Sequence, residues 1–243
     1  MSKAVLELNS LERLEEMVSR SQPFVVRSEK TLMAWPACRK WVGGDGTLYL
    51  TERCGEVVVD VAVSDDLKFS GDVRHAQTVS IPFKSFLEHE GDPNVYLAQC
   101  PLSSSSADAP SGLAALLGDI KVPASLGGEC GRLCSINLWM NRSRPVRSTL
   151  HYDAHNNLLC CLSGTKEVTL LPPDHQLCMG TLHSVYVTGC NHSTVLLDDE
   201  TWQEMIAEGN YMKARIGAGD CLFLPEGWMH QVGVALPFEG MRM

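Results

Sequence analysis

The chain has 243 residues, a formal net charge of −9 at pH 7 and a sequence pI of about 5.3. Its 44% of hydrophobic and 20% of charged residues indicate a folded globular protein and exclude a disordered one. The acidic balance makes nucleic acid an unlikely partner, because a phosphate backbone is bound by basic surfaces. A basic patch is expected only locally, around Arg142, Arg144 and Arg147.

No apolar run approaches the roughly 20 residues that cross a bilayer. Acidic residues such as Glu7 also stand where a signal peptide has its apolar centre. We therefore expect a cytoplasmic or nuclear protein with no membrane partner. In those compartments the ten cysteines should stay reduced. Because their spacings form no paired C-x-x-C knuckles, we expect buried thiols and not a zinc site.

The first half of the chain predicts helices and outer strands. The predicted helices are residues 9–19, 35–41 and 81–88. Asn9 or Ser10 can cap the first, and Pro82 suits the first turn of the last. The predicted strands are residues 23–27, 56–63 and 95–100. The Ser-rich stretch 102–112 and the Pro- and Gly-rich stretch 120–131 predict irregular surface.

From Leu133 onward the β signal dominates. Short apolar or β-branched runs alternate with turn-forming residues, at the spacing of a barrel or sandwich. The predicted strands are residues 134–140, 148–152, 157–161, 167–171, 213–216 and 221–224. A helix is expected at residues 198–208, with Asp198 and Asp199 as its cap and first turn.

Two possible metal ligands, His151 and Asp153, lie two residues apart at the end of a predicted strand. Residues i and i+2 of a strand point to the same face, so both side chains can enter one pocket. Alone, such a pair is more often two unrelated polar residues. His230, in a distant strand, would complete the two-histidine, one-carboxylate face of non-haem Fe(II) oxygenases, and this favours the metal interpretation.

His155 competes as a ligand, because it alternates with His151 and Asp153 on one face. The strand should end near Ala154, however, so we expect His155 at the rim of the pocket. The histidines expected at the surface of a loop are His175, His183 and His192. The tryptophans expected in barrel packing are Trp139 and Trp228.

A series of short motifs runs in one order along most of the chain. The motifs are Trp35…Trp41, Tyr96-Leu97-Ala98-Gln99, Asn137-Leu138-Trp139, His151-Tyr152-Asp153, Asn157-Leu158-Leu159, Gly164-Thr165-Lys166, Leu171-Pro172-Pro173 and residues 219–230. Together they resemble the JmjC or cupin-like family of Fe(II)- and 2-oxoglutarate-dependent oxygenases, and most closely its small hydroxylase branch.

The resemblance implies a mainly β fold, a double-stranded β-helix (a jelly-roll or cupin barrel) with flanking N-terminal helices. Residues 1–243 would form one domain. Residues 1–130 would supply the helices and outer strands, and residues 131–243 would form the metal-binding core of the barrel.

The resemblance also implies a site for Fe(II) and 2-oxoglutarate, with O2 as co-substrate. The implied metal ligands are His151, Asp153 and His230. The implied 2-oxoglutarate contacts are Lys166 to the far carboxylate, Ser148 and Tyr96 beside it, and Asn157 nearby. A buried lysine is costly unless it meets an anion, which a dicarboxylate supplies, and hydroxyl groups can donate to the same carboxylate. The alternatives are a solvated turn for Lys166 and a core position for Tyr96.

Family members usually continue after the last histidine with a further strand that closes one sheet. Here Val232–Leu236 can form part of a strand, but Pro237 and Gly240 interrupt it. We therefore expect a truncated or alternative form, or a barrel that is closed differently, with an open edge that is prone to pairing.

The leading hypothesis is hydroxylation of a protein or peptide side chain, with decarboxylation of 2-oxoglutarate to succinate. The alternatives are a JmjC lysine demethylase, a tRNA-modifying oxygenase and an inactive cupin-like binding module. A cupin isomerase would not need Lys166. Substrate choice would depend on loops 102–128 and 175–199, whose composition names neither a substrate nor an oligomeric state.

Overall fold

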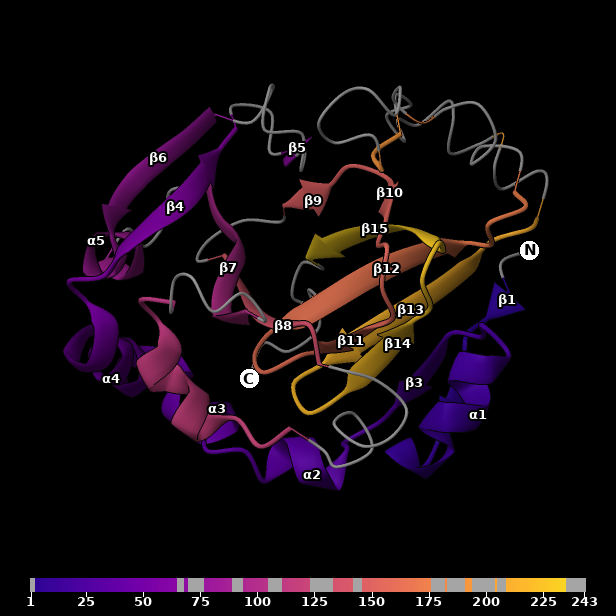
Figure 1. Ribbon diagram of the computed structural model, residues 1–243, viewed down its shortest axis with the longest axis horizontal. Helices are drawn as coiled ribbons and strands as arrows, with labels where there is room; N and C mark the ends of the chain where they lie inside the picture. Colours follow the sequence, from indigo (N-terminus) through magenta and orange to yellow (C-terminus); the bar gives the residue numbers. More distant parts are fainter. Residues whose placement is uncertain are drawn as a thin grey trace, which may run out of the picture.

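The strands form three sheets, and most of the helices lie along their outer side (Figure 1). The computed structural model describes residues 3–64, 68–69, 77–88, 94–104, 111–122, 133–141, 146–175, 182, 191–193, 204 and 209–234. Its α-helices are α1 (Leu14–Ser19), α2 (Lys30–Met33), α3 (Ala37–Lys40), α4 (Gly43–Cys54) and α5 (Phe83–Glu88). Its 3-10 helices are η1 (Leu11–Arg13) and η2 (Ala114–Asp119). No helix in these ranges is long and apolar enough to cross a membrane.

The largest sheet has seven strands and carries the centre of the barrel. Its order is β1 (Lys3–Ala4), β13 (Met212–Gly217), β12 (Thr165–Leu171), β15 (Met229–Val234), β9 (Arg147–Ser148) and β5 (Lys68–Phe69), and β10 (His151–Tyr152) also pairs with β15.

Two four-stranded sheets accompany it. One has the order β11 (Asn157–Cys160), β14 (Cys221–Leu224), β3 (Phe24–Val26) and β2 (Leu6–Leu8). The other has the order β6 (Gln77–Pro82), β4 (Val58–Val63), β7 (Val95–Ser104) and β8 (Ser135–Met140). The prediction of a mainly β, jelly-roll fold with flanking N-terminal helices is confirmed.

The main hydrophobic core joins the N-terminal helices to the strands. It packs Leu14 of α1 and Leu50 of α4 with Phe86 of α5 and with Phe223 of β14. A second cluster lies between the sheets and includes Val168 and Leu170 of β12, Ile216, Leu222 and Trp228. The expected packing role of Trp228 is confirmed.

Strand β12 is central because it pairs with β13 on one side and β15 on the other. Residues Val168–Leu171 are all buried, as expected for a strand covered on both faces. The strand begins at Thr165, two residues before the predicted start, so Lys166 belongs to it.

Two predictions in the first half of the chain are wrong. Residues 81–82 end strand β6 and do not begin a helix, which starts at Phe83. Because β6 is the outer strand of its sheet, a proline without an N–H is tolerated there. The predicted surface loop 102–112 begins too early, since β7 continues to Ser104 and Leu102 is buried.

Helix α4 is not predicted by the sequence pattern. Three glycines at its start, Gly43, Gly44 and Gly46, hid the helical pattern, because glycine is a poor helix former. The structure requires one of them, since a Cβ at Gly46 would lie 2.5 Å from the backbone of Trp41. Leu50 and Cys54, four residues apart, are the buried face.

Several predictions fall outside the described residues. They concern most of the irregular stretch 120–131, most of the helix 198–208 with Asp198 and Asp199, Arg142, Arg144, His183, and the chain after Val234. Strand β15 confirms the first part of the strand predicted at 232–236. Within the described ranges, β8 and β11 are outer strands of their sheets.

Candidate metal and cofactor site

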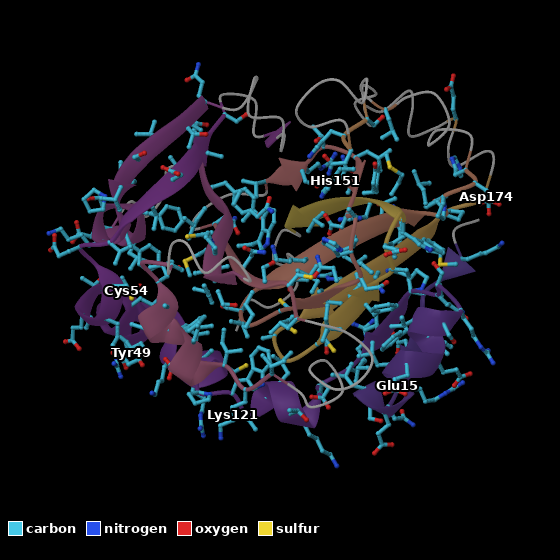
Figure 2. All side chains as sticks on the ribbon, in the orientation of Figure 1. Glu15, Tyr49, Cys54, Lys121, His151 and Asp174 are labelled. Carbon is cyan, nitrogen blue, oxygen red and sulfur yellow. The ribbon has the colours of Figure 1, made fainter. Side chains whose placement is uncertain are left out.

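Pairing of β10 with β15 brings the two predicted histidine ligands together. His151 and His230 are direct partners across the two antiparallel strands, so their side chains point to the same face. Asp153 follows immediately after β10 (His151 is labelled in Figure 2). The ligand atoms of His151, Asp153 and His230 all lie within 4.8 Å of one another, which allows them to hold one metal ion.

Both imidazoles are oriented by hydrogen bonds to backbone carbonyl groups. His151 Nδ1 donates to Thr149 O at 2.8 Å, and His230 Nδ1 donates to Trp228 O at 3.0 Å. These bonds place the proton on Nδ1 and leave Nε2 as the ligand atom of each ring. His230 Nε2 lies 3.7 Å from Asp153 Oδ2, which fits two ligands of a shared ion.

Burial keeps the two histidines in their neutral, metal-binding form. His230 is only 3% exposed. Desolvation, reinforced by the adjacent His151, lowers the pKa of His230 to about 4. Desolvation also lowers the pKa of His151, although the Thr149 carbonyl and Asp153 oppose it. Metal binding therefore does not first require these rings to lose a proton near neutral pH.

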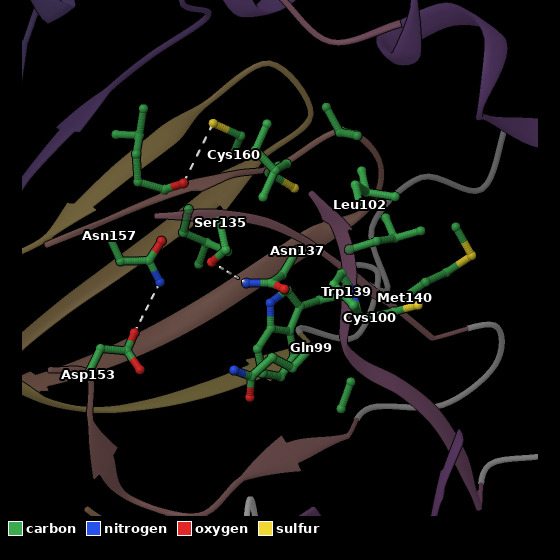
Figure 3. A pocket seen from close by; sticks show the side chains of 18 of the residues that line it. Gln99, Cys100, Leu102, Ser135, Asn137, Trp139, Met140, Asp153, Asn157 and Cys160 are labelled. Carbon is green, nitrogen blue, oxygen red and sulfur yellow. Dashed lines mark hydrogen bonds between the residues drawn. The ribbon is translucent and has the colours of Figure 1, made fainter. Parts of the chain in front are cut away.

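Asp153 is fixed by two hydrogen bonds, one of which is drawn in Figure 3. Asn157 Nδ2 donates to Asp153 Oδ2 at 3.0 Å, and Gly227 N donates to the carbonyl of Asp153 at 3.0 Å. The sequence placed Asn157 near 2-oxoglutarate. The structure places it on the cavity wall with its amide directed to the carboxylate of Asp153.

A cavity of about 1770 Å³ opens beside the metal ligands. Its walls include His151, Asp153 and all four predicted cofactor contacts, Tyr96, Ser148, Asn157 and Lys166. Lys166 and His230 point to the same side of the sheet, because Lys166 pairs with Val234, four residues beyond His230. That spacing corresponds to about 13 Å along the strand.

Lys166 carries an uncompensated charge. Desolvation lowers the pKa of its ammonium group, and only the neighbouring thiol of Cys161 opposes this shift. No carboxylate of the described residues contributes to it. A group of this kind is stabilised by a bound anion.

The two hydroxyl groups on the cavity wall, those of Ser148 and Tyr96, keep their protons. Ser148 Oγ accepts a hydrogen bond from Val232 N at 3.0 Å, which leaves its own proton available. Tyr96 is buried, and desolvation raises the pKa of its phenol, so the hydroxyl stays protonated.

The expectation of surface histidines is wrong for two of them. His192 is 7% exposed and His175 is 2% exposed. His192 forms an isolated β-bridge with His151, a long-range pairing that no local pattern signals. His155 is exposed on the cavity wall, as predicted, and is not among the residues that can share the metal ion.

The cavity also has a polar and aromatic part that the sequence analysis did not assign. Trp139, expected in barrel packing, is 38% exposed, and its ring centroid lies 6.0 Å from that of Tyr96. Gln99 and Asn137 line the same region (Figure 3). Gln99 has a φ of 49° at an irregularity between β7 and β8, a device that redirects side chains at functional sites.

The cysteines of the described residues are free thiols. Those that are buried are Cys54, Cys100, Cys161 and Cys221. Cys38 and Cys160 are half-buried, whereas Cys134 is exposed. The expectation of buried thiols therefore holds for most of them.

Comparisons with known proteins agree with this site. The cupin-like domain model matches residues 10–240. The lysine-specific demethylase JMJ31 of Arabidopsis thaliana is 34% identical over 82% of this chain and 41% of its own length. The human bifunctional peptidase and (3S)-lysyl hydroxylase JMJD7 is 25% identical over 89% of this chain and 75% of its own. The tRNA wybutosine-synthesizing protein 4 of Gibberella zeae is 24% identical over 93% of this chain and 21% of its own.

The chain therefore spans less than half the length of the Arabidopsis and Gibberella relatives. The matched region nevertheless contains the whole cluster of His151, Asp153, His230 and Lys166. Fe(II) and 2-oxoglutarate, the cofactors used by JmjC proteins, suit this set of two imidazoles, a carboxylate and a half-buried ammonium group. With a family match over nearly all of its length, the chain belongs to the cupin-like JmjC family of 2-oxoglutarate-dependent oxygenases.

Proposed function

We propose that the chain hydroxylates a side chain of a protein substrate, with Fe(II) held by His151, Asp153 and His230. The observation that carries this proposal is the cavity that His151, Asp153 and Lys166 line together, with Lys166 on the same side of the sheet as His230. A facial arrangement of three protein ligands leaves positions open for other ligands. The bound metal and 2-oxoglutarate supply an oxidation coupled to decarboxylation.

The chain's own residues would bind and orient the cofactor. The ammonium group of Lys166 pairs with the far carboxylate of 2-oxoglutarate, and the hydroxyl groups of Ser148 and Tyr96 donate to it. Asn157 holds Asp153 in place through the 3.0 Å hydrogen bond. Burial of His230 limits the access of water to the metal.

The size and lining of the cavity support a protein substrate. Ligand pockets measure roughly 300–1,000 Å³, and this cavity is about 1770 Å³, which leaves room beyond the cofactor. The exposed ring of Trp139 and the amides of Gln99 and Asn137 can contact a peptide.

The seven free thiols of the described residues support a cytoplasmic or nuclear location.

Lysine demethylation is the second candidate, supported by the 34% identity with the Arabidopsis demethylase. The acidic balance of the chain, −9, counts against an RNA substrate. A binding module would need the metal ligands but would have no need for Lys166 to face the cavity.

Turnover of 2-oxoglutarate tests the proposal. The protein is incubated with Fe(II), 2-oxoglutarate and O2, with and without peptide and tRNA pools, and succinate is measured. We expect peptide-stimulated succinate formation and peptides that gain one oxygen atom. His151→Ala should abolish both, whereas Lys213→Met, a change of an exposed lysine on β13, should leave both intact.

The other outcomes assign other functions. Peptides that lose a methyl group would support the demethylase, and stimulation by tRNA alone would support an RNA substrate. Metal binding without any turnover of 2-oxoglutarate would leave only the binding module.

A further inference from the structure

A short segment, residues 191–193, is paired along the free side of β10. We call it the strap. The β-bridge joins His192 to His151. Tyr152 N donates to Asn191 O at 3.1 Å, and Ser193 N donates to Leu150 O at 2.8 Å. Asn191 Nδ2 also donates to Tyr152 O at 2.9 Å. The strap therefore continues the pairing of β10 on the side opposite β15.

Thr149 connects the side chain of the strap to the metal ligand. Its carbonyl accepts the proton of His151 Nδ1 at 2.8 Å. Its hydroxyl group shares a hydrogen bond of 2.7 Å with His192 Nδ1. One residue thus fixes the rotation of both imidazole rings.

The two rings are also stacked. The centroids of His151 and His192 lie 4.8 Å apart, with an angle of 10° between the planes. The ring of His230 lies 4.3 Å from that of His151 at an angle of 53°. His151 therefore has two neighbouring imidazole rings. One belongs to His230, the second proposed metal ligand, and the other to His192, whose ring is nearly parallel to that of His151.

We propose that His192 is a positioning residue for the metal site, a role that rests on the proposed metal ligands. By stacking on His151 and bonding to Thr149, it holds the His151 ring so that Nε2 faces the metal. His151 needs such support because it lies on β10, which is only two residues long. The pairing of so short a strand does not by itself orient the side chain of a ligand. Outer groups that orient metal-binding histidines contribute measurably to metal affinity.

Co(II) titration of variants tests this role, with the visible absorption band of the bound ion as the readout. His192→Ala should weaken Co(II) binding by about 10–100-fold and alter the band. His192→Phe keeps a ring for stacking, and Thr149→Val removes the hydroxyl group. His192→Phe and Thr149→Val break the same hydrogen bond. A protein with both changes should therefore bind Co(II) no more weakly than the single variant that has the lower affinity. His192→Asn, which can still bond to Thr149, should recover part of the loss.

The controls separate positioning from folding. Lys213→Met, which removes an exposed lysine on β13 that does not line the cavity, should bind Co(II) like the wild type. Thermal unfolding in the presence of a chelator shows whether each variant is folded. If His192→Ala does not fold, the Co(II) affinity of Thr149→Val tests the inference instead. If His192→Ala and Thr149→Val both bind Co(II) with wild-type affinity and an unchanged band, the inference about His192 is overturned, whereas the proposed metal site is not. A wild-type protein that binds no Co(II) would overturn the metal site and this inference together.

Discussion

Lys166 shows most clearly how a single residue is kept for function at the expense of stability. It lies on a central strand, where burial lowers the pKa of its ammonium group and no described carboxylate compensates it. A lysine whose pKa is lowered on folding reduces stability below that pKa. Stability is regained as the pH rises from the lowered value toward the ordinary one near 10.5.

The first prediction follows from this charge. Lys166→Met keeps the length and removes the charge, so the cofactor-free protein should become more stable at neutral pH. Each kcal/mol gained should raise Tm by about 2–4 °C. The variant should also bind 2-oxoglutarate more weakly, measured by calorimetry in the presence of Co(II). Lys213→Met is the control, and a less stable Lys166→Met protein would contradict the prediction.

The second prediction concerns pH and His230. Because its folded pKa is about 4 and the ordinary value is 6.5, the unfolded chain takes up the proton first. The metal-free protein should therefore lose stability as the pH falls from 6.5 toward 4. Urea unfolding at pH 7.5 and pH 5 should show a smaller pH effect in His230→Gln than in the wild type. An equal effect in both proteins would speak against a buried, neutral His230.

At the scale of elements, the turn between β13 and β14 fixes β14, the strand that precedes the proposed metal ligand His230. Asp220 accepts hydrogen bonds from Ser28 N at 2.9 Å, Gly217 N at 3.0 Å and the Arg27 guanidinium at 2.9 Å. Despite its burial, these donors hold the pKa of Asp220 below its ordinary value. Gly219, with a φ of 90°, provides the left-handed residue of the turn.

The third prediction is that Asp220→Ala destabilises the fold by about 3 kcal/mol, because three donors lose their acceptor. Tm should fall by about 6–12 °C. Asp174→Ala, an exposed turn residue after β12, is the matched control. Equal melting temperatures for the two variants would show that the turn is not held by Asp220.

Most elements of the second half could be predicted because each strand carries its own apolar pattern and its own turn. The predictions that failed had different causes. Helix α4 begins with glycines, which are poor helix formers, and only Gly46 lies close to the backbone of Trp41. Pro82 ends an edge strand, and the position of a strand in its sheet is not visible in a local window.

At the scale of the whole molecule, the proposed metal ligands could be predicted from the sequence, whereas the residues that surround them could not. His151, Asp153 and His230 were recognisable because ligand spacing and strand pattern coincide. His192 was not, since its proposed role depends on the β-bridge between His151 and His192, which are 41 residues apart. Asn157 was expected near 2-oxoglutarate, and its hydrogen bond to Asp153 could not be predicted without the fold.

The fourth prediction follows from the position of the site between elements that are distant in sequence. A metal bound by β10, β15 and the residue after β10 should stabilise the folded state. At a concentration of 100 times Kd, a ligand contributes about 2.7 kcal/mol, or roughly 5–10 °C in Tm. Calorimetry with Co(II), then with added 2-oxoglutarate, should show two successive rises. In Lys166→Met the rise with Co(II) should remain and the further rise with 2-oxoglutarate should be smaller.

The most direct test of the central claim is an anaerobic titration of Fe(II) and 2-oxoglutarate into the apo protein, followed through the visible charge-transfer band of the chelate. We expect a saturable band at one equivalent of each, absent in His151→Ala and weakened in Lys166→Met. A folded protein that takes up Fe(II) and 2-oxoglutarate without this band, or whose band survives His151→Ala, would contradict the assignment of the site.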